Sequence, residues 1–206
     1  MKHLLLAATA AAALASAAPA AAVVITSLPG GTVLAMPQVN VSGFGPQTLA
    51  PGVTWSSTNI TSVFGFILNY ALTTNGNWNG LPPYVGLNVR TGTMTFAFDT
   101  PVSAVGGFLN YAPAAGAPTI AVYDASNVLI ESYILSISTP GGQNAGAFFG
   151  FMQDTPSIAY FTLSNGGVVM RDLTVLAEPA QDTPEPASLA LLAAALCGLG
   201  LTRRRG

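Results

Sequence analysis

Hydrophobic and polar residues alternate along much of this chain. The alternation is clearest in residues 91–98, where Met94, Phe96 and Phe98 are separated by threonine and alanine. Successive side chains of a β-strand point to opposite faces, so a period of two residues predicts a strand with one buried face. Between the two chain ends, no long stretch has the spacing of an amphipathic helix. The pattern therefore predicts short strands joined by turns.

Residues typical of turns separate the other segments that have strand character. Asp124-Ala125-Ser126-Asn127 lies between segments 119–123 and 128–135, and Ser164-Asn165-Gly166-Gly167 lies between segments 157–163 and 168–176. Asp, Asn and Gly favour tight turns, so both pairs of segments are predicted to be β-hairpins. Weaker strand patterns occur at 23–28, 53–56, 62–68, 102–109 and 147–152.

The number and spacing of these segments predict the fold class. About eight to ten short strands occur in about 160 residues, with no internal repeat, which is typical of an all-β protein with an antiparallel β-sandwich of jelly-roll type. A segment of this length can enclose a hydrophobic core. All 18 aromatic residues lie in it, which argues against a disordered stalk.

The N-terminus has the layout of a signal peptide. A short charged start, Met1–His3, precedes an apolar run at 4–15, which is too short for a membrane anchor. Small residues follow in the pattern that signal peptidase recognises, and cleavage is predicted after Ala22, with Ala20 as the next choice. The Sec translocon and signal peptidase are therefore expected partners, and residues 1–22 are assigned to the signal peptide.

The C-terminus predicts a membrane segment. Residues 187–202 carry no charge, and Arg203, Arg204 and Arg205 follow them. A helix of 16 residues spans about 24 Å, slightly less than the about 30 Å hydrocarbon core of a bilayer. Its leucines surround the helix, which argues against packing on the sandwich, and the arginines act as a cytoplasmic stop. Residues 187–206 are thus a predicted transmembrane helix with a basic tail.

The order of motifs in this tail resembles that of a known sorting signal. Pro184-Glu185-Pro186, the apolar helix and the terminal arginines resemble the PEP-CTERM signal of Gram-negative bacteria, over about the last 23 residues. The resemblance implies transient anchoring in the inner membrane and processing by exosortase at Pro184-Glu185-Pro186. It further implies association with exopolysaccharide and a final location at the cell surface or in the extracellular biofilm matrix.

The segment between the ends resembles the β-sandwich ectodomains of PEP-CTERM proteins. The resemblance rests on residues 95–102 running into 105–108, on 148–151 and on 170–175. In the last of these, Arg171-Asp172 stands where the family usually has Asp-Asp or Asp-Asn. The resemblance implies a fold and a location, but no activity. The predicted organisation is then an ectodomain at 23–176, a linker with the Pro-Glu-Pro motif at 177–186, and the membrane segment.

Composition excludes many functions. Between residues 23 and 181 the basic residues are Arg90 and Arg171, against six carboxylates, which argues against binding of nucleic acid or anionic lipid. No His, Cys or Lys occurs from Val23 to Leu196, and Cys197 lies in the tail. This excludes Ser-His-Asp triads, cysteine nucleophiles, Schiff-base lysines and histidine-ligated zinc or copper. A non-enzymatic protein without a required cofactor is expected.

Two kinds of site need only oxygen atoms and remain open. A glycoside hydrolase, the alternative function, requires two carboxylates at a suitable separation. The candidates are Asp99, Asp124, Glu131, Asp154 and Asp172, each of which also has an ordinary role in a turn or in solubility. Calcium could be bound by Asp99 and Asp172 together with backbone carbonyls, although no dense run of aspartates is present.

Residues 69–88 form a long segment without a strand pattern. Such segments are usually functional or disordered. This one contains Tyr70, Asn77, Trp78, Asn79 and Tyr84, and aromatic rings beside amides suit a sugar-binding surface. The alternative is that Trp78 and Tyr84 fasten the segment to the sandwich. The sequence therefore leads to the hypothesis that this segment binds exopolysaccharide.

Overall fold

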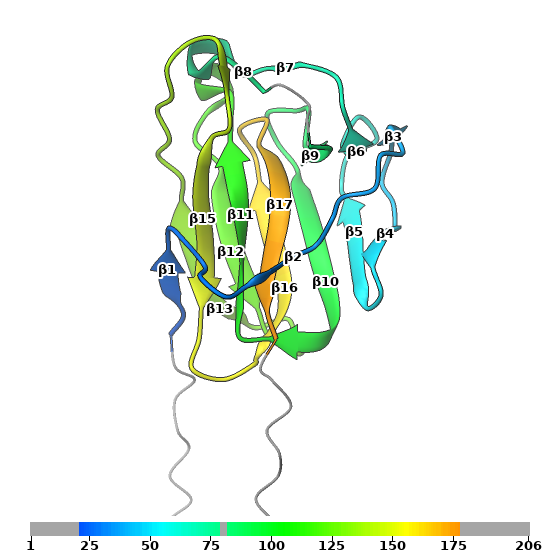
Figure 1. Cartoon of the computed structure of the whole chain (residues 1–206), viewed down its shortest axis with the longest axis vertical. Coiled ribbons are helices and arrows are strands. Elements are labelled where there is room, and N and C mark those ends of the chain that lie inside the picture. Colours follow the sequence, from blue (N-terminus) through cyan, green and yellow to red (C-terminus); the bar gives the residue numbers. More distant parts are fainter. Residues whose placement is uncertain (1–20, 79–81, 178–206) are drawn as a thin grey trace, which may run out of the picture.

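The computed structural model of the protein describes residues 21–78 and 82–177, and these residues form an antiparallel β-sandwich (Figure 1). The predicted signal peptide, membrane helix and Pro-Glu-Pro motif lie outside the described residues, apart from Ala21 and Ala22. Two 3-10 helices, η1 (Thr73–Asn75) and η2 (Pro113–Ala115), interrupt the strands. Within the described part of the chain no helix is long and apolar enough to cross a membrane.

The first sheet has eight strands, and all of its pairs are antiparallel. Its order is β1 (Val23–Ile25), β15 (Ala147–Met152), β11 (Ala104–Asn110), β17 (Val169–Leu176), β9 (Tyr84–Gly86), β6 (Val63–Phe66) and β3 (Val41–Ser42), and β2 (Thr32–Val33) pairs with β17.

The second sheet has six strands and is also antiparallel. Its order is β13 (Leu129–Ile134), β12 (Thr119–Tyr123), β16 (Ile158–Ser164), β10 (Thr93–Val102), β5 (Val53–Ser57) and β4 (Gln47–Ala50). A small third sheet consists of β14 (Gln143–Asn144), β8 (Asn77–Trp78) and β7 (Tyr70–Ala71), in which β14 and β8 are parallel.

The core lies between the two large sheets and follows from the alternation in the sequence. Met94, Phe96 and Phe98 of β10 are buried, while their neighbours are more exposed, as predicted. Phe161 of the second sheet contacts Phe151 of the first, with ring centroids 6.4 Å apart. All residues of both hydrophobic clusters lie between positions 22 and 175. The described segment thus contains its own core, which is the condition for independent folding.

One of the two predicted hairpins is confirmed. β12 and β13 pair with each other, and Oδ1 of Asp124 accepts hydrogen bonds from the N–H groups of Ser126 and Val128, each at 2.8 Å. Asn127 closes the turn at φ 63°. Aspartate favours this arrangement because its short side chain can bond the backbone two residues later.

The second predicted hairpin is wrong. β16 and β17 follow each other across a glycine-rich turn but lie in different sheets. Both edges of β16 are already occupied, by β12 and β10, so no edge is left for β17. Residues 165–167 instead carry the chain from one sheet to the other.

The register places both ends of the described chain at the same end of the sandwich (Figure 1). Four residues of adjacent strands form one row: Val23, Met152, Ala104 and Leu176. A second row, at the opposite end of the same sheet, contains Asn110, Val169 and Gly86. The step from Val169 to Leu176 along β17 is seven residues, so the two rows are about 24 Å apart at about 3.4 Å per residue.

The segment at 69–88 contains more structure than expected. β7, η1, β8 and β9 all lie within it, and residues 79–81 are outside the described part. Each element has only two or three residues, which is too short to show a period in the sequence. β7 and β8 pair with each other, but their remaining partners and those of β9 are distant in the sequence: β9 pairs with β6 and β17, and β8 pairs with β14.

Candidate functional site

The aromatic residues predicted to form a site come together, but mainly as a packed cluster. The ring of Tyr84 is central, with centroids 6.0 Å from Tyr70, 6.4 Å from Trp78 and 6.3 Å from Phe66. All three contacts are edge-to-face, which is a favoured geometry for aromatic pairs. Val63, Leu72 and Val169 complete this second hydrophobic core.

Burial decides the role of two of these rings. Trp78 is 0% exposed and Tyr84 1% exposed, so neither has a ring face on which a sugar could stack. The expectation that both belong to a sugar-stacking surface is therefore wrong, and the alternative that they fasten the segment to the sandwich is confirmed. The hydroxyl of Tyr84 also donates to the carbonyl of Leu68 at 2.9 Å. Asn77 is exposed on β8, and Asn79 lies outside the described residues.

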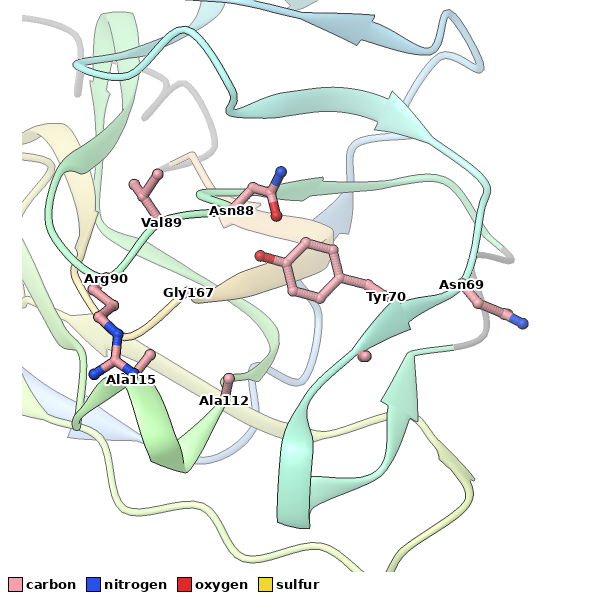
Figure 2. Close-up of a pocket in the computed structure, with 9 residues that line it drawn as sticks. Asn69, Tyr70, Asn88, Val89, Arg90, Ala112, Ala115 and Gly167 are labelled. Carbon is pink, nitrogen blue, oxygen red and sulfur yellow. The ribbon is translucent and has the colours of Figure 1, made fainter.

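Tyr70 is placed differently, because its half-buried side chain borders two cavities. One cavity has a volume of about 400 Å³ and the other of about 420 Å³, and both are lined by Asn69, Tyr70 and Asn88. Arg90 and Gly167 also line the first cavity. Figure 2 shows the Tyr70 ring extending from β7 between Asn88 and Gly167, with its hydroxyl toward the side of Arg90 and the Asn69 side chain pointing away.

The side chain of Tyr70 is uncharged at neutral pH and can form hydrogen bonds. Burial raises the pKa of Tyr70 to about 12, although a hydrogen bond with the Asn88 backbone acts in the opposite direction. A phenol with this pKa stays protonated at neutral pH. Tyr70 therefore lines the first cavity as a neutral phenol.

The floor of the first cavity is built from backbone segments that meet at the end of the sandwich. The N–H groups of Gly166 and Gly167 donate to the carbonyls of Arg90 and Val89, both at 3.0 Å, and Ala112 N–H donates to the Gly166 carbonyl at 3.2 Å. Gly166 and Gly167 have φ 65° and 60°, a region that glycine adopts without strain. These bonds hold the crossing between β16 and β17 against the segment that carries Arg90.

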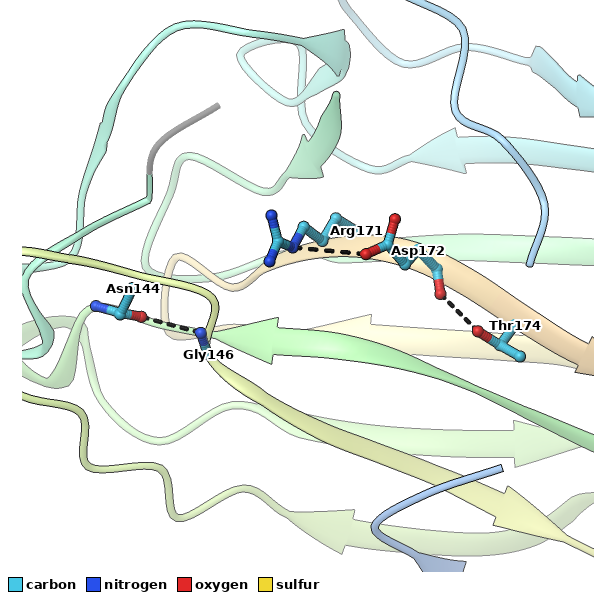
Figure 3. Close-up of polar contacts among 5 residues, drawn as sticks. All are labelled: Asn144, Gly146, Arg171, Asp172 and Thr174. Atoms are coloured by element: carbon cyan, nitrogen blue, oxygen red, sulfur yellow. Dashed lines mark hydrogen bonds and ion pairs between the residues drawn. The ribbon is translucent and has the colours of Figure 1, made fainter. Parts of the chain in front are cut away.

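Three asparagines brace the loops beside this cavity. Nδ2 of Asn75 donates to Oδ1 of Asn110 at 3.0 Å, and Nδ2 of Asn110 donates to Oδ1 of Asn144 at 2.8 Å. Nδ2 of Asn144 returns to the carbonyl of Asn75 at 2.6 Å, and its Oδ1 accepts from the N–H of Gly146 (Figure 3). Thr139 joins the same network through Asn75 and Asn110. The network connects η1, the end of β11 and the strand β14.

The network was not predicted from the sequence. Asn75 is 3% exposed and Asn110 is 0% exposed, so their amides depend on one another for hydrogen bonds. Asparagine is common in exposed turns, and the three residues are about 35 positions apart in the sequence. No local pattern distinguishes them from turn asparagines.

Arg171 is held by neighbouring side chains. Its Nε lies 3.6 Å from Oδ2 of Asp172, and its guanidinium carbon lies 5.3 Å from the Trp78 ring centre and 5.8 Å from that of Phe108. The strand β17 bulges here, with Asp172 at φ 54° and its carbonyl accepting from the hydroxyl of Thr174 (Figure 3). A bulge re-aims a side chain, and this one places Arg171 over the two rings.

The predicted calcium ligands do not form a group. Asp99 lies in β10 of the second sheet, whereas Asp172 lies in β17 of the first and pairs with Arg171. The described residues contain no group of three or more His, Cys, Asp or Glu side chains that could hold a metal ion. The calcium hypothesis therefore has no ligand set in this part of the chain.

The carboxylates of the alternative hydrolase are likewise dispersed. Asp124 caps its turn, Oε1 of Glu131 accepts from the N–H of Ser132 at 2.9 Å, and Asp154 is exposed in a loop. None of these three, nor Asp99 or Asp172, lines either cavity beside Tyr70. A glycosidase needs two carboxyl groups facing one cleft, and these cavities do not provide them.

Comparisons with known proteins give similarities in fold only. No family model and no curated protein matches the chain. Among solved structures, a His 62 mutant of the lectin-binding domain of lectinolysin, complexed with Lewis b, is 11% identical, with a TM-score of 0.40, over 70% of this chain and 99% of that one. A fucose-binding module of Streptococcus pneumoniae is 10% identical, with a TM-score of 0.40, over 74% and 99%.

A third similar structure is CsCBM6-3 from Clostridium stercorarium in complex with cellobiose. It is 14% identical, with a TM-score of 0.31, over 72% of this chain and 99% of that one. Because all three TM-scores are below 0.5, the similarities do not identify a ligand for this chain.

Proposed function

We propose that this chain is an exported, non-enzymatic PEP-CTERM protein of the cell surface or extracellular matrix, whose sandwich binds carbohydrate beside Tyr70. In this proposal Sec exports the protein, signal peptidase removes its leader, and the tail holds it briefly in the inner membrane. Exosortase then acts at Pro184-Glu185-Pro186. The sequence of the tail supports the sorting steps, and the cavity beside Tyr70 supports the binding.

The proposal includes a jelly-roll topology for the sandwich. Its support is the strand order β9-β17-β11-β15 in one sheet and β10-β16-β12-β13 in the other. From β9 onward the chain passes between the sheets at every connection except the hairpin from β12 to β13. Such a path brings loops from many strands together at one end, where a ligand can contact several of them.

The observation that carries the binding proposal is the position of Tyr70 at the wall of a cavity of about 400 Å³. A volume of this size lies within the range of small-molecule sites. Sugars are bound by aromatic carbons, which cover their C–H groups, and by amides and hydroxyls, which bond their own hydroxyls. Tyr70 offers both kinds of contact, and Asn88 adds an exposed amide at the same wall.

The position of the cavity relative to the chain ends also supports the proposal. Ala112 and Gly167 line the cavity, and each is two residues beyond the row of Asn110 and Val169 at the end of its strand. This row is about 24 Å along β17 from Leu176. The linker to the sorting tail begins directly after Leu176. A domain attached through this linker would present the cavity on the side away from its attachment.

Isothermal titration of residues 21–177 against the producer's own exopolysaccharide tests the binding. We expect saturable heat, a loss of at least about tenfold in affinity for Tyr70→Ala, and no change for Tyr123→Ala. Tyr123 is a half-buried tyrosine in β12, at the end of the sheet remote from the cavity, and so serves as the matched control. Absence of heat with the unmodified domain would contradict the binding proposal.

The sorting steps are tested separately. Mass spectrometry of the secreted protein should show a C-terminus at or near Pro184-Glu185-Pro186 when exosortase is present. Without exosortase the protein should retain its tail in the membrane fraction. A secreted mature form that still ends in Arg203-Arg204-Arg205 would contradict processing while leaving the binding result intact.

A further inference from the structure

The two arginines of the described chain have different surroundings. Arg171 is paired with Asp172 and covered by two aromatic rings. Arg90 is exposed and lines the cavity beside Tyr70. Among the described residues the only ion pair is that of Arg171 with Asp172, so no carboxylate of this part of the chain neutralises Arg90.

The charge of the cavity is opposite to that of the domain. Within the described residues two arginines stand against five carboxylates, and none of the carboxylates lines this cavity. The other lining residues are neutral: asparagine, tyrosine, valine, alanine and glycine. Arg90 is therefore the local source of charge, and an anion is attracted here while the rest of the surface repels it.

The single guanidinium of Arg90 indicates which kind of anion the cavity would bind. A guanidinium offers a planar fork of N–H donors that matches a carboxylate in two parallel hydrogen bonds. One guanidinium balances one carboxylate. A phosphate carries more charge and is usually held by several cationic donors or by the N-terminus of a longer helix. Among the described residues, this cavity is lined by one arginine, and its only helical element is the three-residue η2.

We propose that the cavity binds an acidic sugar residue of a polysaccharide, with its carboxylate on Arg90 and its ring beside Tyr70. This inference rests on the proposed carbohydrate binding and names its substrate class. The amide of Asn88 and the hydroxyl of Tyr70 bond sugar hydroxyls, and Ala112 and Ala115, just before and at the end of η2, cover the remaining apolar edge. Uronic acids have this chemistry: one carboxylate on a ring that otherwise carries hydroxyls.

The test compares the producer's exopolysaccharide before and after chemical reduction of its carboxyl groups, which converts each uronic acid to the neutral sugar. Isothermal titration of residues 21–177 should show affinity for the native polymer that falls at least tenfold after reduction. The affinity for the native polymer should also fall as salt is raised, because salt screens the pairing of exposed charges.

Substitutions at two positions locate the effect. Arg90→Gln should lower affinity for the native polymer at least tenfold and leave affinity for the reduced polymer unchanged, whereas Arg90→Lys should retain part of the preference. Ala115→Phe keeps Arg90 but fills the rim of the cavity, and should weaken binding as well. Thermal unfolding of each variant serves as the check that the sandwich remains folded.

The outcomes separate this inference from the proposed function. Equal affinity for the native and reduced polymers, with loss only in Tyr70→Ala, would overturn the acidic-sugar proposal and leave carbohydrate binding in place. Affinity for the native polymer that is unchanged by both Arg90→Gln and Ala115→Phe would overturn it too. No binding to either polymer would overturn both proposals.

Discussion

The ring of Tyr70 stands edge-on to the ring of Tyr84, with centroids 6.0 Å apart and an angle of 86° between the planes. This contact joins the wall of the cavity to the buried cluster of Trp78, Tyr84 and Leu72. Tyr70, which we propose contacts a ligand, is thus positioned by buried residues that a ligand cannot reach. Substitutions in the cluster should therefore affect both stability and binding.

The two tyrosines should make the domain sensitive to alkali. Burial raises the pKa of Tyr84 to about 12, with a smaller contribution from the neighbouring Tyr70, and burial likewise raises that of Tyr70 to about 12. In the unfolded chain both pKa values are about 10. The folded state therefore binds more protons between pH 10 and 12. The stability that these two tyrosines contribute is fully present below pH 10 and is lost as the pH rises through 12.

Urea unfolding at pH values from about 9 to 12 measures this loss. Tyr84→Phe keeps the ring but removes one ionisable group, so its free energy of unfolding should fall less steeply across the same interval. At neutral pH the variant should be less stable by about 1 kcal/mol, because the carbonyl of Leu68 loses its donor. An alkaline loss identical to that of the unmodified protein would refute this assignment.

Removing Asn110 should strongly destabilise the domain. Asn110→Ala leaves the buried N–H of Tyr111 without its acceptor and removes one hydrogen bond each from the side chains of Asn75 and Asn144. An unpaired buried group costs about 1–3 kcal/mol, and each lost hydrogen bond about 1 kcal/mol. We expect a loss of about 3 kcal/mol in the free energy of unfolding, measured by urea denaturation. Asn77→Ala, at an exposed position of β8, is the matched control and should change stability by less than about 0.5 kcal/mol.

Substitution by alanine should affect stability at one of the two arginines and not at the other. Arg171→Ala removes contacts to two rings and one carboxylate, and cation–π contacts are worth about 0.5–2 kcal/mol each. Its melting temperature should fall by several degrees, about the shift expected for 2 kcal/mol. Arg90→Ala should leave the melting temperature unchanged, because its exposed side chain has no ion pair within the described residues. Equal shifts in the two variants would contradict the different roles assigned to them.

The burial of Ala22 bears on the position of the predicted signal cleavage site. Its side chain is 6% exposed and belongs to the main hydrophobic cluster, whereas Ala21 is exposed. Cleavage after Ala22 would remove a core residue, but cleavage after Ala20 would keep it. We therefore predict that the mature protein begins at Ala21, and N-terminal mass spectrometry of the exported protein checks this. A mature protein beginning at Val23 would show that the core tolerates the loss.

Local patterns in the sequence predicted the longer strands well. β10, β12 and β15 were expected because their alternating or apolar residues reflect burial, which is a property of each strand alone. Pairing depends on what occupies both edges of a strand. The turn at 164–167 has good hairpin residues, yet β16 is flanked by β10 and β12, so the chain crosses to the other sheet.

The site could be predicted only in part for a similar reason. Tyr70 was identified because an aromatic residue beside asparagines in a long segment is a local feature. Arg90, Ala112 and Gly167 lie far apart in the sequence and meet only where three loops converge. Trp78 and Tyr84 had the composition of a binding surface, but their apolar area made them the anchors of the segment instead.

The asparagine network has a consequence for the conditions under which the loops keep their shape. Asn75, Asn110, Thr139 and Asn144 fasten them with amide and hydroxyl groups, which neither gain nor lose a proton across the pH range of natural waters. Dissolved ions screen charges but do not loosen bonds between buried neutral groups. In the extracellular location that we propose, acidity and salinity follow the surroundings. The loops around the cavity should keep their shape under these changes, and only the attraction of Arg90 for an anion should weaken as the salt concentration rises.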